Sequence, residues 1–323
     1  MAVKELLVPG IVAITAVIIG WFIVDKVRSG DPFQDKNLLL KGMDRPVVWV
    51  FVNTSDVNSR SWADFMSRSS KVMNLPFLNV CYESLVLNLK DVFRFEVIGG
   101  LQDLAQRLGG WEALPSTLQN PQTVLREPEL NWVRSAVLAK WGGLWVDPAM
   151  VWLKPLPLTV LPKDKVVFFG TNPDDTYATG KDVPSLKVIW SPKPAHPVWV
   201  DWEQKVRARL EWRTGGSEFR HDERKDVIDA VQNFPNDVQV FRIPEVSRKG
   251  GNRRRIELED LLAAGTEGEL PFDVCSNGVY VPIPYPEILE RESFGWFLRM
   301  SEDQILESDL VISHLLKKGL RIV

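Results

Sequence analysis

Short apolar runs alternate with amphipathic stretches through most of the chain. Residues 45–52 (RPVVWVFV) form a nearly continuous apolar run, which is typical of a strand buried on both faces of a sheet. Residues 59–72 carry apolar side chains at spacings of three and four, which predicts a helix. Residues 76–81 (PFLNVC) and 93–97 (FRFEV) are again short and apolar, and we interpret both as strands. This order predicts an α/β protein with a mostly parallel sheet flanked by helices.

The same alternation continues toward the carboxyl end. Residues 127–141 predict a strong amphipathic helix, and the Gly142-Gly143 pair supplies a helix-stop signal. Residues 144–147 then predict a short strand that ends in a carboxylate. Further expected elements are strands at 166–170, 186–190 and 238–243, helices at 198–210, 224–232, 286–299 and 302–318, and a basic loop at 247–255.

The first residues differ from the rest because residues 6–24 carry no charged side chain over 19 positions. A helix of that length spans roughly 28 Å at about 1.5 Å per residue, close to the ~30 Å hydrocarbon core of a membrane. A secretory signal peptide and a buried core helix are the alternatives, but the apolar region of a signal peptide is shorter and ends in small residues. We therefore expect a transmembrane anchor over residues 1–25, a linker over 26–44 and one folded domain over 45–323.

The charges beside the anchor suggest an orientation. Lys4 flanks one side, and four basic residues flank the other, namely Lys26, Arg28, Lys36 and Lys41. Basic flanks favour the cytosolic side of a membrane. We expect a single-pass membrane protein whose large domain faces the cytosol or matrix.

Composition limits the function classes. The chain has 45% hydrophobic and 25% charged residues, the values of an ordinary folded protein. Its net charge is -3, without the basic excess of nucleic-acid-binding proteins, so we expect no nucleic-acid partner. Two cysteines, Cys81 and Cys275, exclude a disulfide scaffold and a four-cysteine zinc site, whereas one bridge between them stays open.

Residues 131–156 (NWVRSAVLAKWGGLWVDPAMVWLKPL) join the helix, the glycine pair and the strand-end carboxylate. This segment resembles the sugar-binding segment of small GT-A glycosyltransferases, of the capsular polysaccharide synthesis type and of the α-mannosyl and α-galactosyl transferases with a degenerate DXD. The resemblance extends over roughly residues 45–210. The matching positions are Asn131, Arg134, Gly142, Gly143, Trp145, Asp147 and Ala149.

The resemblance implies a GT-A-like, Rossmann-like fold and transfer of a hexose from a nucleotide sugar to a glycan or lipid acceptor. Asp147 would face a Mn²⁺ or Mg²⁺ ion and the donor diphosphate, because a cation held by carboxylates neutralises the charge of the leaving group. Arg134 would act with Asp147, since its planar fork can orient a carboxylate or sugar hydroxyl groups. The donor sugar would meet Asn131, Gly142, Gly143 and Trp145, where the glycines allow close approach of the ligand.

Two departures from the family pattern support a second hypothesis. Asn131 stands where the family has its first Asp, and Ala149 stands where a DXD has its second Asp. Only Asp147 then remains as a hard oxygen ligand for a metal ion. The alternative is a catalytically inactive, glycosyltransferase-like accessory subunit of a larger membrane complex.

Several other residues have both a functional and a structural interpretation. His196 could be catalytic or bind a metal, but between Ala195 and Pro197 we expect it to pack or to cap the next helix. His314 could be a metal ligand on a C-terminal helix, although a core or surface histidine is the favoured interpretation. The basic loop could bind phosphates or lipid headgroups, but we favour a solvated loop. Four tryptophans could stack on sugar rings or fill the core: Trp132, Trp141, Trp145 and Trp152.

Overall fold

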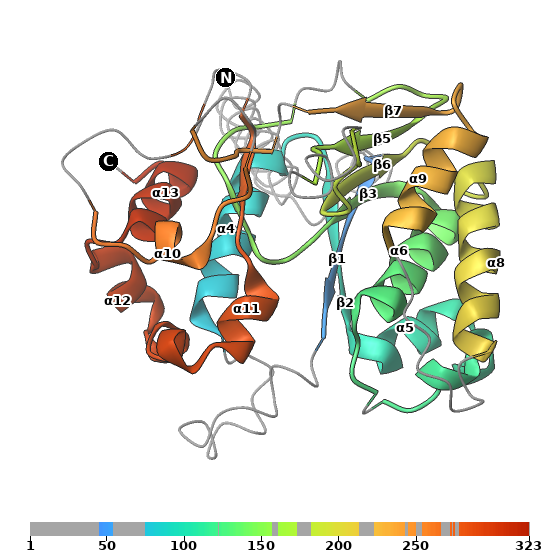
Figure 1. The fold of residues 1–323 in the computed structure, drawn as a ribbon, viewed down its shortest axis with the longest axis horizontal. Coiled ribbons are helices and arrows are strands. Elements are labelled where there is room, and N and C mark those ends of the chain that lie inside the picture. Colours follow the sequence, from blue (N-terminus) through green and yellow to red (C-terminus); the bar gives the residue numbers. More distant parts are fainter. Residues whose placement is uncertain are drawn as a thin grey trace, which may run out of the picture. The chain divides into compact units, whose positions relative to one another are not determined.

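Six strands form one twisted sheet in the order β2–β1–β3–β6–β5–β7 (Figure 1). The structure is a computed structural model, and it describes residues 45–53, 75–121, 123–156, 161–172, 182–212, 223–242, 245–249, 254–265, 272, 274 and 278–322. The strands are β1 (Val47–Val52), β2 (Arg94–Gly99), β3 (Gly143–Val146), β5 (Val166–Phe169), β6 (Val188–Ser191) and β7 (Val238–Phe241). Strand β6 is antiparallel to β3 and β5, and the other pairs are parallel. The prediction of an α/β protein with a mostly parallel sheet is confirmed.

Strand β1 lies inside the sheet and is buried along its whole length. Successive side chains of a strand point to opposite faces. Val48 and Val50 therefore pack into one hydrophobic core, while Trp49 and Phe51 pack into the other. The continuous apolar run at 45–52 is explained by these two cores.

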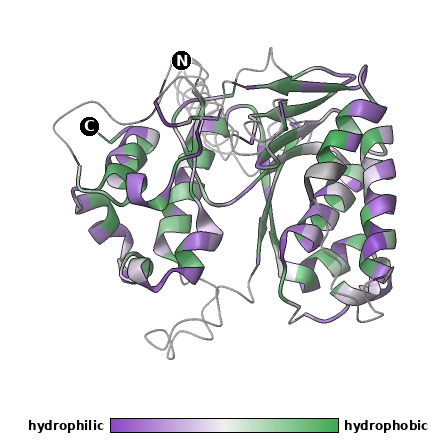
Figure 2. Cartoon of the chain, viewed as in Figure 1, coloured by the Kyte–Doolittle hydropathy of each residue, from purple (hydrophilic) through white to green (hydrophobic). Residues whose placement is uncertain are grey.

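Helices cover both faces of the sheet. One face packs against α5 (Gly100–Leu108), α6 (Glu127–Trp141), α8 (Pro197–Trp212) and α9 (Glu223–Asn233). The other packs against α4 (Pro76–Leu89), α10 (Leu258–Leu261), α11 (Tyr285–Glu290), α12 (Glu302–Glu307) and α13 (Val311–Leu320), and against a small sheet of β4 (Met150–Trp152) and β8 (Tyr280–Pro282). Short 3-10 turns lie at Trp111–Ala113, Ser116–Leu118, Glu292–Phe294 and Phe297–Arg299. Figure 2 shows apolar residues throughout the sheet and mixed colouring along the helices, as expected for elements with one buried side.

The strand that we predicted at residues 76–81 is wrong, because these residues begin helix α4. Six apolar residues fit a buried strand or a buried helix equally well. Over the longer stretch Pro76–Leu89 the buried positions recur at helical spacing, with Phe77, Cys81, Ser84 and Asn88 on the covered side. Pro76 at the first turn costs the helix no hydrogen bond. The Cys81 thiol is buried and free, and burial raises its pKa to about 12.

The two C-terminal helices predicted at 286–299 and 302–318 are each divided in the structure. The first is interrupted at Arg291, whose backbone is extended (φ −92°, ψ 105°). The second is interrupted at Ser308, which is also extended (φ −68°, ψ 154°). The Ser308 hydroxyl accepts or donates a 2.7 Å hydrogen bond with Ser313, which fixes the turn between α12 and α13.

The remaining predicted elements agree with the structure to within a few residues, and α6 has the predicted bounds. The expected helix at 59–72 lies outside the described residues. Residues 6–24, where we expect the anchor, also lie outside them. Within the described ranges, no helix is both long enough and apolar enough to cross a membrane.

Candidate functional site

A cavity of about 450 Å³ opens at the edge of the sheet where β1 and β3 end. Asn53 and Asp147 follow these two parallel strands, and both line the cavity. Because β6 is antiparallel to β3, the residue that precedes it, Lys187, comes to the same edge. The Asp147 amide donates a 2.9 Å hydrogen bond to the Lys187 carbonyl, so the two residues are neighbours across the strands. Ligands of open α/β sheets bind at this kind of edge.

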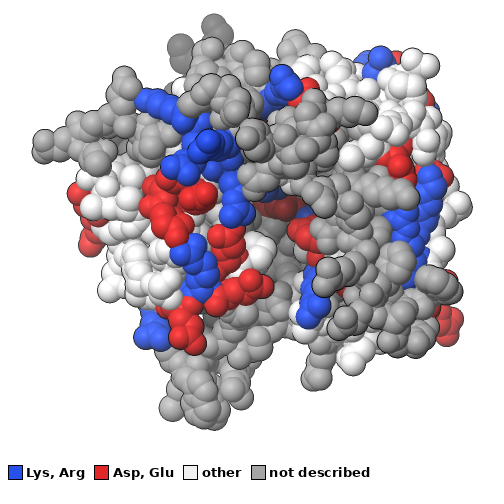
Figure 3. Space-filling model, in the orientation of Figure 1, with Lys and Arg blue, Asp and Glu red and all other residues white. Residues whose placement is uncertain are grey.

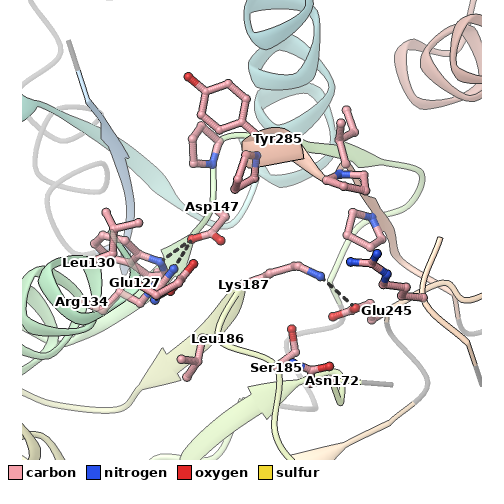
Figure 4. Close-up of a pocket in the computed structure, with 18 of the residues that line it drawn as sticks. Glu127, Leu130, Arg134, Asp147, Asn172, Ser185, Leu186, Lys187, Glu245 and Tyr285 are labelled. Atoms are coloured by element: carbon pink, nitrogen blue, oxygen red, sulfur yellow. Dashed lines mark hydrogen bonds and ion pairs between the residues drawn. The ribbon is translucent and has the colours of Figure 1, made fainter. Parts of the chain in front are cut away.

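One side of the cavity is formed by the start of α6 and the end of β3, and we call its residues Glu127, Arg134 and Asp147 the acidic wall (Figure 4). The Arg134 side chain is only 5% exposed. Its Nη1 donates to Glu127 Oε2 at 2.9 Å and to Asn131 Oδ1 at 2.8 Å, and its Nη2 lies 3.6 Å from Asp147 Oδ1. The planar guanidinium thus fixes three oxygen-bearing side chains at once.

The Asp147 carboxylate is held through one of its two oxygens. Trp145 Nε1 donates a 3.0 Å hydrogen bond to Oδ1, the same oxygen that faces Arg134. The side chain remains 26% exposed, toward the cavity. Oδ2 is therefore the oxygen that can meet a ligand.

The pKa values of the two carboxylates in the acidic wall are shifted in opposite directions. Burial raises the pKa of Asp147, although the Arg134 guanidinium opposes part of that rise. The same guanidinium lowers the pKa of Glu127. Lys187 also stabilises both ionised carboxylates, which places its positive charge close to the acidic wall.

Lys187 and Glu245 line another part of the cavity (Figure 4), and Tyr280 lies buried behind Glu245; we call these three residues the basic wall. Glu245 is 3% exposed, and its Oε1 lies 3.2 Å from Lys187 Nζ. Its Oε2 accepts a 2.8 Å hydrogen bond from the Tyr280 hydroxyl, which also contacts the Phe169 carbonyl. Burial, followed by the Glu245 charge, raises the pKa of Tyr280 well above its usual range, so the phenol stays protonated.

Gly170 makes the space for the basic wall. Its φ of +126° is a conformation that residues with a Cβ rarely adopt. A Cβ at this position would lie 2.5 Å from Glu245 Oε2 and 2.8 Å from the Tyr280 hydroxyl oxygen. The backbone after β5 is therefore shaped around the buried carboxylate.

Beyond this wall, the α10–α11 side of the molecule carries intermixed acidic and basic side chains (Figure 3). Arg255 pairs with Glu287 at 2.8 Å, and both residues line the cavity. Arg291 pairs with Glu259 and Glu287. Charges of both signs are therefore present around the cavity.

Of the residues predicted for the site, Arg134, Trp145 and Asp147 line the cavity together. Asn131 is 1% exposed and lies behind Arg134 as a hydrogen-bond acceptor. Ala149 lines the cavity without a polar group.

Gly142 and Gly143 are not among the residues that line the cavity, and in the structure groups of the protein itself approach them closely. A Cβ on Gly142 would lie 2.8 Å from the Lys193 carbonyl carbon, and a Cβ on Gly143 would lie 2.6 Å from the Val47 carbonyl oxygen. Trp49 Nε1 donates to the Gly142 carbonyl at 2.8 Å. In the structure the glycine pair lets β3 lie close to β1.

The described histidines and most of the four tryptophans pack in the protein or hydrogen-bond to it, and they do not line the cavity. His196 is 1% exposed, and its carbonyl accepts the first amide hydrogen bonds of α8, as expected for a packing and capping residue. His314 is on the surface, with Nε2 2.8 Å from Asp309 Oδ1. Trp132 and Trp152 are buried in the two cores, and Trp141 packs against Trp49. His221, Cys275 and residues 250–253 of the basic loop lie outside the described residues.

The residues of the basic wall were missed by the sequence analysis. Lys187, Glu245 and Tyr280 belong to three separate segments, and none of them is part of a motif. The one signal was Lys187 itself, a charged residue in the otherwise apolar run LKVIW.

The carboxylates of the cavity do not by themselves meet the needs of a metal ion. Among the described residues, no three or more His, Cys, Asp or Glu side chains are grouped so that they could hold one. Asp147 Oδ2 is one hard oxygen donor, and Glu127 is engaged by Arg134. These side chains alone do not form a complete metal site, and a substrate would have to supply most of the ligands.

No protein-family model matches this sequence, and no curated protein matches it.

Proposed function

We propose that this chain is a membrane-anchored glycosyltransferase of GT-A-like fold, which moves a hexose from a nucleotide sugar to a glycan or lipid acceptor. One observation carries the proposal. The segment that resembles a glycosyltransferase sugar-binding segment brings Arg134, Trp145 and Asp147 to the wall of a cavity at the carboxyl edge of the sheet. A cavity of about 450 Å³ is within the usual size range of small-molecule sites.

In this proposal the acidic wall receives the sugar end of the donor. Asp147 Oδ2 accepts a hydrogen bond from a sugar hydroxyl or faces a cation that accompanies the diphosphate. Arg134 and Trp145 hold the other oxygen, so the carboxylate has one orientation before substrate arrives. Such preorganisation reduces the reorganisation needed during transfer. Among the residues that the structure describes, the side chains by themselves form an incomplete site for Mn²⁺ or Mg²⁺.

The test uses purified full-length protein and a panel of UDP- and GDP-sugars, with and without Mn²⁺. A donor present at about 100 times its Kd should raise the free energy of unfolding by about 2.7 kcal/mol. Asp147→Ala should abolish the rise, and Asp91→Ala, a change at an exposed turn away from the cavity, should keep it. Release of the nucleoside diphosphate on addition of glycan or lipid acceptors then tests transfer.

The second candidate is a glycosyltransferase-like accessory subunit without activity. The observation that favours it is the acidic wall itself, where Arg134 engages both carboxylates and Ala149 supplies no further oxygen. In that case a donor would either leave the unfolding unchanged or bind without release of its nucleotide. Either result in well-folded protein would replace the transferase proposal with this one.

A further inference from the structure

The basic wall differs from an incidental surface ion pair because its carboxylate is buried and bonded through both of its oxygens. A carboxylate that is 3% exposed loses hydration, and burial of this kind is tolerated when the charge is paired and hydrogen-bonded. Glu245 has both compensations, a lysine on Oε1 and a buried tyrosine hydroxyl on Oε2. The positive φ of Gly170 provides the space for them. Four segments of the chain therefore combine to hold one ammonium group at the cavity.

Lys187 is the exposed member of this group. Its side chain is 37% exposed and lines the cavity. An ammonium group has three N–H donors, and one of them is directed at Glu245 Oε1. The others are available to a ligand in the cavity, and charge-assisted hydrogen bonds from lysine to phosphate oxygens are among the stronger polar contacts in proteins.

The position of Lys187 relative to Asp147 determines the orientation of a ligand that contacts both residues. The two residues are neighbours across β3 and β6, joined by the 2.9 Å backbone hydrogen bond. A ligand that binds both must present hydroxyl groups or a cation to the carboxylate and an anion to the ammonium. A sugar joined to a diphosphate has this sequence of groups.

We propose that Lys187 binds the diphosphate of the nucleotide-sugar donor, and that Glu245 and Tyr280 are positioning residues that hold its ammonium group at the cavity. This inference rests on the proposed function and adds the residue that recognises the leaving group. It also assigns a role to a charged cluster that lies outside the segment of family resemblance at 131–156.

The experiment measures binding by calorimetry with full-length protein, using UDP, GDP, CDP and ADP as probes, in the presence and absence of Mn²⁺. The probe that binds is then compared with its monophosphate and its nucleoside. Lys187→Met should weaken the diphosphate by about 10- to 100-fold, the range of one charged hydrogen bond. Its effect on the nucleoside should stay within about twofold, because that part of the probe carries no phosphate. Lys187→Arg, which keeps the charge, should restore part of the affinity.

Glu245→Gln tests positioning, because it keeps the size of the side chain and its contact with Tyr280. It should weaken diphosphate binding by about 3- to 10-fold and leave nucleoside binding unchanged. The double variant Lys187→Met/Glu245→Gln should bind like Lys187→Met alone, because Glu245 acts through Lys187. A purely structural role would instead weaken all three probes equally. The control is Lys163→Met, an exposed lysine away from the cavity.

The outcomes separate this inference from the function on which it rests. If no nucleoside diphosphate binds the wild-type protein, both are overturned. If one binds and Lys187→Met binds it within twofold of the wild type, the donor site stands and the role of Lys187 is overturned. A selective loss of diphosphate affinity in Lys187→Met, partly restored in Lys187→Arg, supports both.

Discussion

The two walls of the cavity differ in the sign of the ion that each one buries. In the acidic wall the buried ion is a cation, Arg134, and the partly exposed ions are the carboxylates Glu127 (45%) and Asp147 (26%). In the basic wall the buried ion is a carboxylate, Glu245, and the partly exposed ion is the ammonium of Lys187. Each wall therefore presents to the cavity the charge opposite to the one that it buries.

The difference shows how one small cavity can present both signs of charge without their simply neutralising each other. A buried ion has few positions open to it and holds its exposed partner in place. The exposed partner keeps access to a ligand. Because the buried members have opposite signs, the charges offered on the two sides also have opposite signs, and the cavity is polarised from Asp147 toward Lys187.

The largest expected effect concerns Gly143, which begins β3, the strand that leads to Asp147. Gly143→Ala should lower the free energy of unfolding by about 3 kcal/mol or more, because it combines an unfavourable φ of +94° with a clash against the Val47 backbone oxygen. Gly170→Ala, behind the basic wall, should cost about 2 kcal/mol, since the atoms it meets include side chains that can shift. Urea unfolding of each variant measures these changes.

The control for both is Gly109→Ala, where φ is +109° and a Cβ would meet nothing within 4 Å. Backbone strain alone should cost about 1 kcal/mol there. Equal costs at all three positions would contradict the packing roles that we assign to Gly143 and Gly170.

The second effect concerns the buried cation. Arg134→Met should destabilise the protein by about 2–3 kcal/mol, because it leaves the Asn131 carbonyl without its donor and two carboxylates without their shared cation. Arg107 offers a matched control, since it also contacts two carboxylates, Glu96 and Asp103, but its side chain is 31% exposed. Arg107→Met should cost less than about 1 kcal/mol. Similar costs in urea unfolding would show that burial is not what distinguishes Arg134.

The smallest effect is in the pH dependence of the acidic wall. The pKa of Asp147 in the folded state is raised above its ordinary value of 3.8, so the folded state binds the carboxyl proton more tightly than the unfolded state does. The free energy of unfolding therefore falls as the pH rises from 3.8 through the folded-state pKa. Asp147→Asn should therefore stabilise the protein at pH 7 by about 0.5–1 kcal/mol, a usual size for such gains. The gain should disappear below pH 3.8, as followed by thermal unfolding against pH.

Glu127 should behave in the opposite way, which provides the internal control. Its pKa is lowered below 4.5 by Arg134, so its contribution to stability is present above 4.5 and is lost as pH falls through the folded-state pKa. Glu127→Gln should destabilise the protein at pH 7. If both variants shifted stability in the same direction, it would be wrong that burial dominates the pKa of Asp147 and that pairing with Arg134 dominates the pKa of Glu127.

Two residues of the acidic wall, Arg134 and Asp147, could be predicted from the sequence because they are close together in the chain, whereas Glu127 was not predicted. Helix α6 places Asn131 and Arg134 one turn apart, and the glycine pair returns the chain directly to Asp147 at the sheet edge. The helix period and the stop signal are local properties, so they are visible in one stretch of sequence.

The basic wall could not be predicted in this way. Its members Lys187, Glu245 and Tyr280, and the Gly170 that makes space for them, come together only through the pairing of β5, β6 and β8 with their neighbours. The strand predicted at 76–81 failed for a related reason, since its local pattern fits two structures and the tertiary packing of α4 decides between them. Tertiary pairing of this kind has no signature in a single sequence.

The wide spacing of the two walls along the chain sets an order of events during synthesis. All three residues of the acidic wall have been synthesised once Asp147 is added, whereas the last residue of the basic wall is Tyr280 in β8. At about 5–20 residues per second the interval is on the order of ten seconds. Within that time Glu245 is synthesised before the tyrosine that hydrogen-bonds its carboxylate.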